Sequence, residues 1–160
     1  MALLCAVSPL LLGFILPGTV ERMCARGNRL YRAQQYEKAE QAYAQALAAR
    51  PGDPTLLYNR GTALYQMGKF DAAAQTLSAA LADAPKQLQR DLHYNLGNSF
   101  YRGQQLERAI EQYKQALRLD PNDEDARYNL EMALKQQEKQ QQKQQQQQEQ
   151  QQQQRQQQQP

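Results

Sequence analysis

One spacing recurs along the middle of the chain and restricts the fold more than any other feature. Glycines stand at Gly27, Gly61 and Gly97, which are 34 and 36 residues apart. The same two offsets relate five further columns, made of small residues, bulky residues, leucines and prolines: Ala39, Ala73 and Ala109; Tyr43, Leu77 and Tyr113; Ala46, Ala80 and Ala116; Leu47, Leu81 and Leu117; Pro51, Pro85 and Pro121. The unit is therefore 34 residues long, with two extra residues, Leu88 and Gln89, before the third copy. Repeats of this length are typical of solenoids built from stacked helical hairpins.

The columns have physical reasons that predict two antiparallel helices in each copy. The two alanine columns lie seven residues apart, which is two helical turns, so they share one face and let a neighbouring helix approach closely. Proline ends the second helix, because it lacks an N–H and clashes with the preceding turn. Asp53 before Pro54 is an N-cap signal. The predicted helices are 20–33 and 36–49, 54–67 and 70–83, and 88–102 and 105–118.

A seventh helix is predicted from the cap signal at Asn122 or Asp123. Its apolar residues Ala126, Leu130 and Leu134 have helical spacing, and it covers the open end of the stack. We therefore divide the chain into an apolar segment 1–19, a repeat domain 20–135 (repeats 20–53, 54–87 and 90–123, capping helix 124–135) and a Gln-rich tail 136–160. Glutamine is a fair helix former, but the tail has no apolar stripe, so we expect a frayed helix that grades into disorder.

The repeat resembles the tetratricopeptide repeat (TPR) in its glycine, alanine, tyrosine, alanine-leucine and proline positions. The resemblance covers about two-thirds of the chain and departs from the family pattern at Arg26 and Arg60, where the family usually has leucine. It implies an all-α fold, a right-handed α-solenoid of three TPR helix pairs with a C-terminal capping helix.

A narrower resemblance concerns residues 92–130 followed by the Gln-rich tail. The strings HYNLGN (93–98) and DPNDEDARYNL (120–130) are similar to TPR proteins of bacterial aerotolerance (Bat) operons. This resemblance implies a partner among membrane proteins with von Willebrand factor A domains, and a membrane-associated or exported protein. The extracytoplasmic side of a bacterial membrane is favoured, with the cytoplasmic face as the alternative.

The apolar segment 1–19 is long enough for a signal peptide or a membrane anchor. The cations Arg22, Arg26 and Arg29 come only after it, and the positive-inside rule applied to them would hold the body in the cytoplasm. A start codon assigned too late would hide a charged segment and reverse that orientation. The sequence therefore predicts membrane contact through this segment and leaves cleavage and sidedness open.

In TPR arrays the first helix of each pair lines the concave surface, and this resemblance selects the candidate peptide-binding residues. The dipeptide Tyr-Asn recurs there at 58, 94 and 128. One hypothesis is an asparagine ladder that bonds the main chain of an extended peptide, with Tyr as contact area and Arg as a clamp for acidic groups. The alternative is that Tyr-Asn only helps the repeats pack. The candidates are Asn28, Tyr31, Arg32, Tyr58, Asn59, Thr62, Tyr65, Tyr94, Asn95, Asn98, Tyr101, Arg102, Tyr128 and Asn129.

The carboxylate clamp of some chaperone-binding TPR domains is matched only in part. Asn28 and Asn59 fit its asparagine positions, whereas Cys24, Asp91 and Asn95 stand where it needs basic residues. We therefore expect no preference for acidic C-termini of that kind.

The sequence indicates a non-catalytic protein, with no cofactor and no metal site. His93 is the only histidine and occupies a core-facing column, so we expect it to be packed. The net charge of +3 is diffuse, with no basic block of the kind that binds nucleic acid. We predict a scaffold that binds a polypeptide in the concave groove; the alternative is a structural module that self-assembles through the hairpins and the tail.

Overall fold

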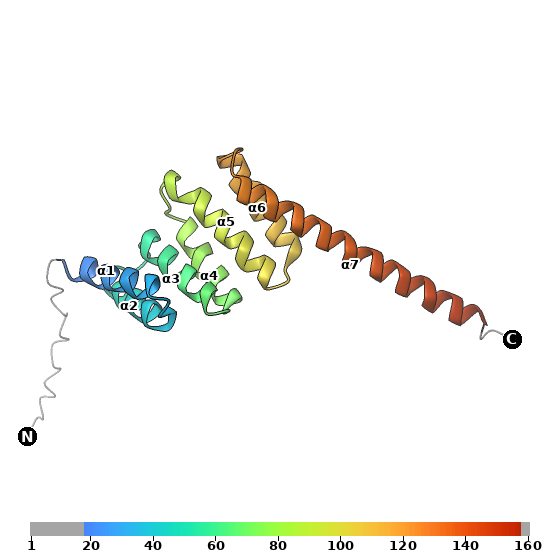
Figure 1. The fold of residues 1–160 in the computed structure, drawn as a ribbon, viewed down its shortest axis with the longest axis horizontal. Helices are drawn as coiled ribbons and strands as arrows, with labels where there is room; N and C mark the ends of the chain where they lie inside the picture. Colours follow the sequence, from blue (N-terminus) through green and yellow to red (C-terminus); the bar gives the residue numbers. More distant parts are fainter. Residues whose placement is uncertain (1–17, 158–160) are drawn as a thin grey trace, which may run out of the picture.

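Three helical hairpins stack along the chain, and a long seventh helix extends from the end of the stack (Figure 1). The computed structural model describes residues 18–157. The apolar segment predicted at 1–19 lies almost entirely outside the described residues. The helices are α1 Thr19–Arg32, α2 Tyr36–Ala49, α3 Pro54–Gln66, α4 Phe70–Leu81, α5 Lys86–Arg102, α6 Leu106–Leu119 and α7 Glu124–Gln157. The predicted all-α hairpin architecture is confirmed.

The small columns of the repeat place the helices against one another. Ala39, Ala73 and Ala109 are completely buried, as are Ala46, Ala80 and Ala116. At each glycine the opposing bulky residue fills the space that a side chain would need: an added Cβ would lie 2.4 Å from the ring of Tyr43, 2.6 Å from Leu77 and 2.5 Å from Tyr113. Glycine in the first helix and a bulky residue in the second therefore form one interlocking unit in every hairpin.

The stack curves toward its first helices. Each helix packs on its neighbour in chain order, and the first helices also contact one another in the pairs α1 with α3, α3 with α5 and α5 with α7. Within residues 18–157 the second helices α2, α4 and α6 make no such contacts with one another. Because the first helices lie closer together than the second ones, they line the inner, concave face.

The ends of the helices follow the predicted cap signals with small shifts. Asp53 Oδ1 accepts from the N–H groups of Thr55 and Leu56 at 3.0 and 3.1 Å, as an N-cap should. At the start of α7 it is Asp123, of the two predicted candidates, that accepts from the N–H of Ala126, at 2.9 Å. The two extra residues before the third copy lengthen the first turn of α5, which begins at Lys86 and not at 88.

A turn feature absent from the prediction joins the two helices of each hairpin. Gln34, Gly68 and Gln104 stand in one repeat column and all have positive φ, at 57, 74 and 60°. In each case the following N–H bonds back to the carbonyl of the first helix, as Gln35 N does to Leu30 O at 2.9 Å. This is the left-handed C-terminal motif that favours glycine, yet two of the three positions hold glutamine.

Arg60 stands where the family pattern has leucine, and it forms a polar contact between hairpins. Its Nε donates to Glu40 Oε1 on α2 at 2.7 Å, and both side chains are partly covered. The equivalent Leu96 in the third copy is buried. The junction between the first and second hairpins is therefore sealed partly by an ion pair.

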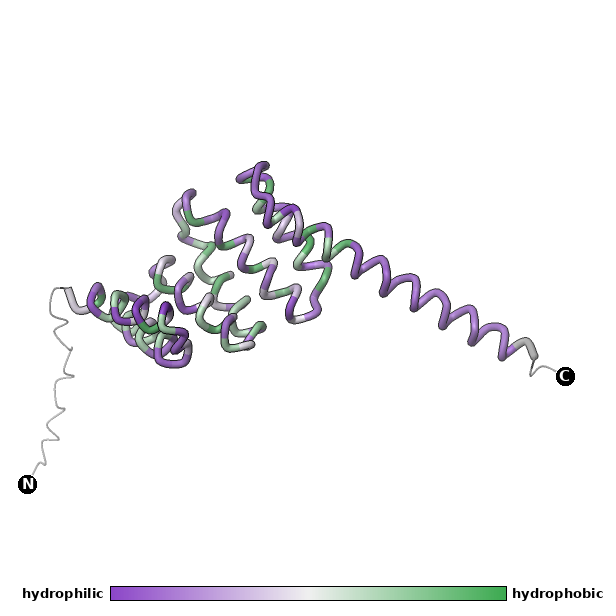
Figure 2. The backbone as a smooth tube through the Cα atoms, viewed as in Figure 1, coloured by the Kyte–Doolittle hydropathy of each residue, from purple (hydrophilic) through white to green (hydrophobic). Residues whose placement is uncertain are grey.

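A frayed helix that grades into disorder was expected for the Gln-rich tail, and the helical part of that expectation agrees with the structure. α7 continues as regular helix from the capping region to Gln157, because glutamine loses little side-chain freedom in a helix. Beyond Gln137 every side chain described up to Arg155 is exposed, and Figure 2 shows this part of the tube as uniformly hydrophilic. The extension therefore buries nothing and forms a single projecting helix.

Candidate peptide-binding groove

The concave face contains two hollows, and the first lies between α1 and α3. This N-terminal hollow has a volume of about 340 Å³. Six of its seven lining residues are predicted candidates, and the seventh is Tyr43 from α2. The walls are Asn28, Tyr31, Arg32, Tyr43, Tyr58, Asn59 and Thr62.

The second hollow lies where α3, α5 and α7 meet, and we call it the C-terminal hollow. Its volume is about 240 Å³. Again six predicted residues take part, joined by Tyr113 from α6 and Met132 from α7. The walls are Tyr65, Asn98, Tyr101, Arg102, Tyr113, Tyr128, Asn129 and Met132.

The two remaining candidates, Tyr94 and Asn95, lie half-buried on α5 and line neither hollow. Asn95 Nδ2 donates to the hydroxyl of Tyr58 at 3.1 Å, and the hydroxyl of Tyr94 accepts from Asn129 Nδ2 at 3.2 Å. These residues thus link the first helices of successive hairpins.

The asparagines of the Tyr-Asn dipeptides form a ladder, but its rungs are internal. Each Asn donates to the residue one repeat earlier in the tyrosine column: Asn95 to Tyr58, Asn129 to Tyr94, and Asn59 to Cys24 Sγ at 3.8 Å. Cys24 occupies the position that tyrosine has in the later repeats. The Nδ2 donors therefore hold repeats together, as the packing hypothesis proposed. No residue within 18–157 donates to the Oδ1 atoms of these three asparagines.

Tyr43 and Tyr113 are the site residues that sequence reasoning missed. They come from second helices, yet their hydroxyls reach the concave face and donate to Asn28 Oδ1 and Asn98 Oδ1, both at 2.8 Å. Burial raises the pKa of Tyr43 from 10.0 to about 12, and it raises the pKa of Tyr113 in the same direction.

A signal for these bonds is present in the sequence. The first and third copies pair a tyrosine with an asparagine fifteen residues earlier, whereas the second copy pairs Leu77 with Thr62. Because Leu77 has no hydroxyl, Thr62 accepts no hydrogen bond from the second helix. Its own hydroxyl donates to the carbonyl of Asn59 on the same helix, at 2.8 Å. Within the chain, asparagine in the first helix therefore occurs together with tyrosine in the second, and threonine occurs together with leucine.

The charges of both hollows are positive. Arg32 lines the first and Arg102 the second, both are exposed, and no carboxylate lines either hollow. Arg102 also lies over the ring of Phe70, 5.0 Å from its centre, which restrains the guanidinium. The arrangement offers aromatic surface, amide oxygens and cations to a ligand in the groove.

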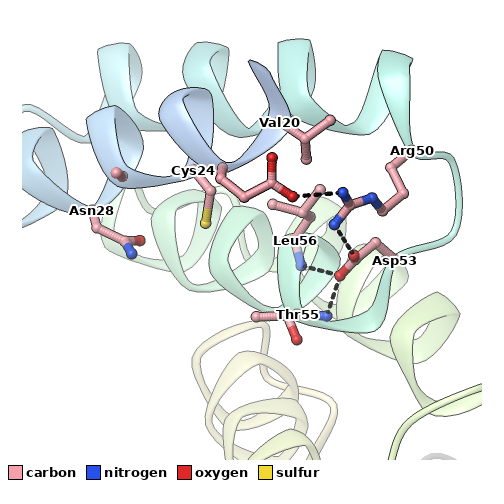
Figure 3. Close-up of a pocket in the computed structure, with 9 residues that line it drawn as sticks. Val20, Cys24, Asn28, Arg50, Asp53, Thr55 and Leu56 are labelled. Atoms are coloured by element: carbon pink, nitrogen blue, oxygen red, sulfur yellow. Dashed lines mark hydrogen bonds and ion pairs between the residues drawn. The ribbon is translucent and has the colours of Figure 1, made fainter. Parts of the chain in front are cut away.

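A separate pocket lies at the N-terminal edge of the stack and is shown in Figure 3. Val20 and Leu56 form its apolar part, and Arg50 bridges Glu21 at 2.7 Å and Asp53 at 3.5 Å along its rim. The hydrogen bond from Arg50 lowers the pKa of Glu21. The half-buried thiol of Cys24 also lines this pocket, and burial raises its pKa. A raised pKa keeps this thiol in its protonated form, which is the weaker nucleophile.

His93 is half-buried between α5 and α6, with Nδ1 2.8 Å from Gln112 Oε1. Over residues 18–157 no three histidine, cysteine or carboxylate side chains gather as metal ligands would. The helices described there include none with the length and apolar character of a membrane span.

A family model described as "Tetratricopeptide repeat" matches residues 24–87, 58–124 and 94–138. These segments overlap and together span well over half of the chain. No curated protein sequence matches the chain.

Solved structures of the same fold are numerous. The first TPR of Spaghetti (RPAP3) bound to the HSP90 peptide SRMEEVD is similar with a TM-score of 0.69 and 25% identity, over 73% of this chain and 91% of that one. The Sgt2 TPR domain from Aspergillus fumigatus has a TM-score of 0.68 and 25% identity, over 74% and 79%. The TPR2AB domain of yeast Sti1, in complex with pHSP90, has a TM-score of 0.66 and 26% identity, over 75% and 48%.

Proposed function

Because the chain belongs to the tetratricopeptide repeat family, we propose that it is a non-catalytic scaffold that binds a partner polypeptide along its concave face. The observation that carries this proposal is the pair of hollows on that face, lined mainly by Tyr, Asn and Arg side chains, most of them exposed or half-exposed. Tyrosine and arginine are the residues most often responsible for binding energy at protein interfaces. The related RPAP3 domain holds a peptide, which supports the same use here.

The groove favours an extended chain. Its two hollows lie in succession along the first helices, and the rigid tyrosine rings in their walls supply contact area at small entropic cost. The Oδ1 atoms of Asn59 and Asn129, in the walls of the two hollows, accept from main-chain N–H groups of the bound segment, which requires no particular side chain. The ligand's own side chains then occupy the hollows.

The test uses groove variants that leave the core intact. Tyr128→Ala and Arg32→Ala remove exposed groove side chains, and Glu111→Ala with Arg118→Ala removes exposed side chains of α6 as a matched control. The full-length protein is used to isolate its partner from membranes, and the dissociation constant of the purified pair is then measured for each variant. We expect the groove variants to weaken binding by roughly tenfold, about 1.4 kcal/mol, and the control to bind as the wild type. Equal binding by all variants with unchanged helicity would contradict a ligand in the groove.

We further propose, from the resemblance to the aerotolerance proteins, that the partner belongs to a membrane complex with von Willebrand factor A-domain proteins. In this proposal the apolar segment 1–19 attaches the scaffold to the membrane or directs its export, with the domain on the extracytoplasmic side. Protease accessibility of the repeat domain in intact cells and in spheroplasts tests the side. Digestion only after the inner membrane is broken would place the domain on the cytoplasmic face.

A second candidate function is self-assembly, which the apolar side chains at the end of the stack favour. Leu119 and Leu134 are 48% and 42% exposed, on α6 and α7. Size-exclusion chromatography with and without residues 136–160 tests this function. An oligomer that becomes monomeric without the tail, and whose formation is unaffected by the groove variants, would favour assembly over peptide binding.

A further inference from the structure

The part of α7 beyond the last hairpin has a basic side. Lys135, Lys139 and Lys143 are spaced by four residues, and each such step turns about 40° around a helix, so the three ammonium groups point to one side. With Tyr101 of α5, Met132 and two glutamines they line a groove of about 450 Å³, which we call the lysine groove. All three lysines are exposed.

The lysine groove continues the concave face. It shares Tyr101 and Met132 with the C-terminal hollow. Tyr128 and Met132 lie four residues apart on the same side of α7 as the lysines, Tyr128 two turns before Lys135 and Met132 two turns before Lys139. A ligand that leaves the C-terminal hollow along α7 therefore reaches the lysines directly.

The charges along this path are of one sign. Arg32 and Arg102 line the two hollows and three lysines line the groove, whereas no aspartate or glutamate lines any of the three. From Glu131 onward the carboxylates of α7 face other directions: Glu131, Glu138 and Glu149 are turned about 80 to 100° away from Lys139. Of these, Glu131 pairs with Lys135 at 2.6 Å, which leaves Lys139 and Lys143 without an ion pair among the described residues.

We propose that the lysine groove is part of the ligand site and binds an acidic, extended segment of the partner polypeptide. This inference rests on the proposed function and names the chemistry of the ligand. From Met132 to Lys143 the helix advances about 17 Å at 1.5 Å per residue, which about five residues of extended peptide span. Alternate acidic side chains of such a segment meet successive lysines.

The site differs from a clamp for a free C-terminus. Cys24, Asp91 and Asn95 stand at the positions where a clamp needs cations, and the lysines lie on an open stretch of helix with no end wall. An internal acidic segment therefore binds as well as a terminal one. A flat anionic membrane surface is the less suitable occupant, because the path begins inside a concave hollow lined by tyrosines.

The experiment measures binding of labelled peptides to the full-length protein by fluorescence anisotropy. The probes are an alternating Glu-Ser peptide of about eighteen residues with an amidated end, long enough at roughly 3.3 Å per residue to reach from the hollows to Lys143, and its Gln-Ser counterpart. We expect the acidic peptide to bind, its affinity to fall as salt rises, and the glutamine peptide to bind at least tenfold more weakly.

The triple variant Lys135→Gln, Lys139→Gln and Lys143→Gln is compared with Lys38→Gln, Lys86→Gln and Lys114→Gln, which loses the same charge from exposed positions elsewhere. We expect about a tenfold loss for the first and less than a twofold loss for the second. Equal losses would show attraction by net charge alone and overturn the proposal, as would binding to vesicles of anionic lipid with no binding of the acidic peptide. If the purified partner still depends on Tyr128 and Arg32 but is indifferent to the lysines, the lysine groove is refuted while the concave scaffold stands.

Discussion

The hydroxyl of Tyr43 donates a hydrogen bond of 2.8 Å to Oδ1 of Asn28, and Tyr113 repeats the same bond to Asn98 at 2.8 Å. Each bond joins the second helix of a hairpin to the groove-facing side of its first helix. Both tyrosines are buried, at 2% and 1% exposure, so the asparagine oxygen is the main hydrogen-bond partner of each hydroxyl. The walls of the groove and the core of the hairpin are therefore one structure.

The first prediction concerns this bond. Tyr43→Phe removes the hydroxyl that donates this bond, so no buried donor is left without a partner, and it should lower the free energy of unfolding by about 1 kcal/mol. Asn28→Ala leaves the buried hydroxyl without its acceptor and should cost more, about 1–3 kcal/mol. Urea unfolding followed by circular dichroism measures both. The double variant should resemble Tyr43→Phe, and Thr62→Ala, which faces Leu77, serves as the control with a smaller effect.

The second prediction concerns the left-handed turn inside each hairpin. Gln34 and Gln104 have φ values of 57 and 60°, a conformation that costs a residue with a Cβ about 1 kcal/mol. Gln104→Gly should therefore stabilise the protein by roughly 0.5–1 kcal/mol, and Gly68→Gln should destabilise it by a similar amount. Thermal unfolding compares the two. A loss of stability in Gln104→Gly would mean that the left-handed turn is not strained.

The third prediction concerns the interlocking of glycine with its bulky partner. A Cβ at position 61 would lie 2.6 Å from Leu77 Cγ, so Gly61→Ala should push the two helices apart and cost about 1–3 kcal/mol. Adding Leu77→Ala gives the new methyl group room. The double variant should therefore be less unstable than the sum of the two single variants. Strict additivity in denaturant unfolding would argue against the contact.

The fourth prediction concerns alkaline pH. The folded pKa of Tyr43 is about 12 and its ordinary value is 10.0, so above pH 10 the unfolded chain loses this proton while the folded chain keeps it. Stability from this group is complete below pH 10.0 and is lost as pH rises toward 12. Burial raises the pKa of Tyr58 and Tyr113 in the same direction, which adds to the decline. Urea midpoints across this range should fall, and more gently in Tyr43→Phe; a midpoint constant over the range would refute the shift.

The fold was predictable from the sequence because its determinants are local and repeated. Glycine, alanine and proline columns report close helix contacts and helix ends directly, and three copies make the columns visible. The end of α2 at Ala49 and the cap at Asp53 follow from such signals.

What escaped prediction depends on contacts between distant residues or on backbone strain. That Tyr43 crosses to the groove follows only from the packing of α2 on α1, and the donors of Asn59 and Asn95 are engaged only because the first helices lie side by side. The left-handed turn at Gln34 could not be predicted from the sequence, because the position holds glutamine and not the glycine that usually marks such a turn. The extent of the helix in the tail was underestimated because burial was taken as a requirement, whereas the propensity of glutamine and the continuation of a formed helix suffice.

α7 stands where a fourth hairpin would have its first helix, but it has Glu131 in the column of Gly27, Gly61 and Gly97. A second helix packed on α7 in the same way would place its tyrosine or leucine against the Cβ of Glu131. In the three hairpins the corresponding space is free only because glycine has no Cβ. A further hairpin inserted before α7 would keep the glycine contact. It would move the groove's two ends apart and leave the projecting helix as the terminus.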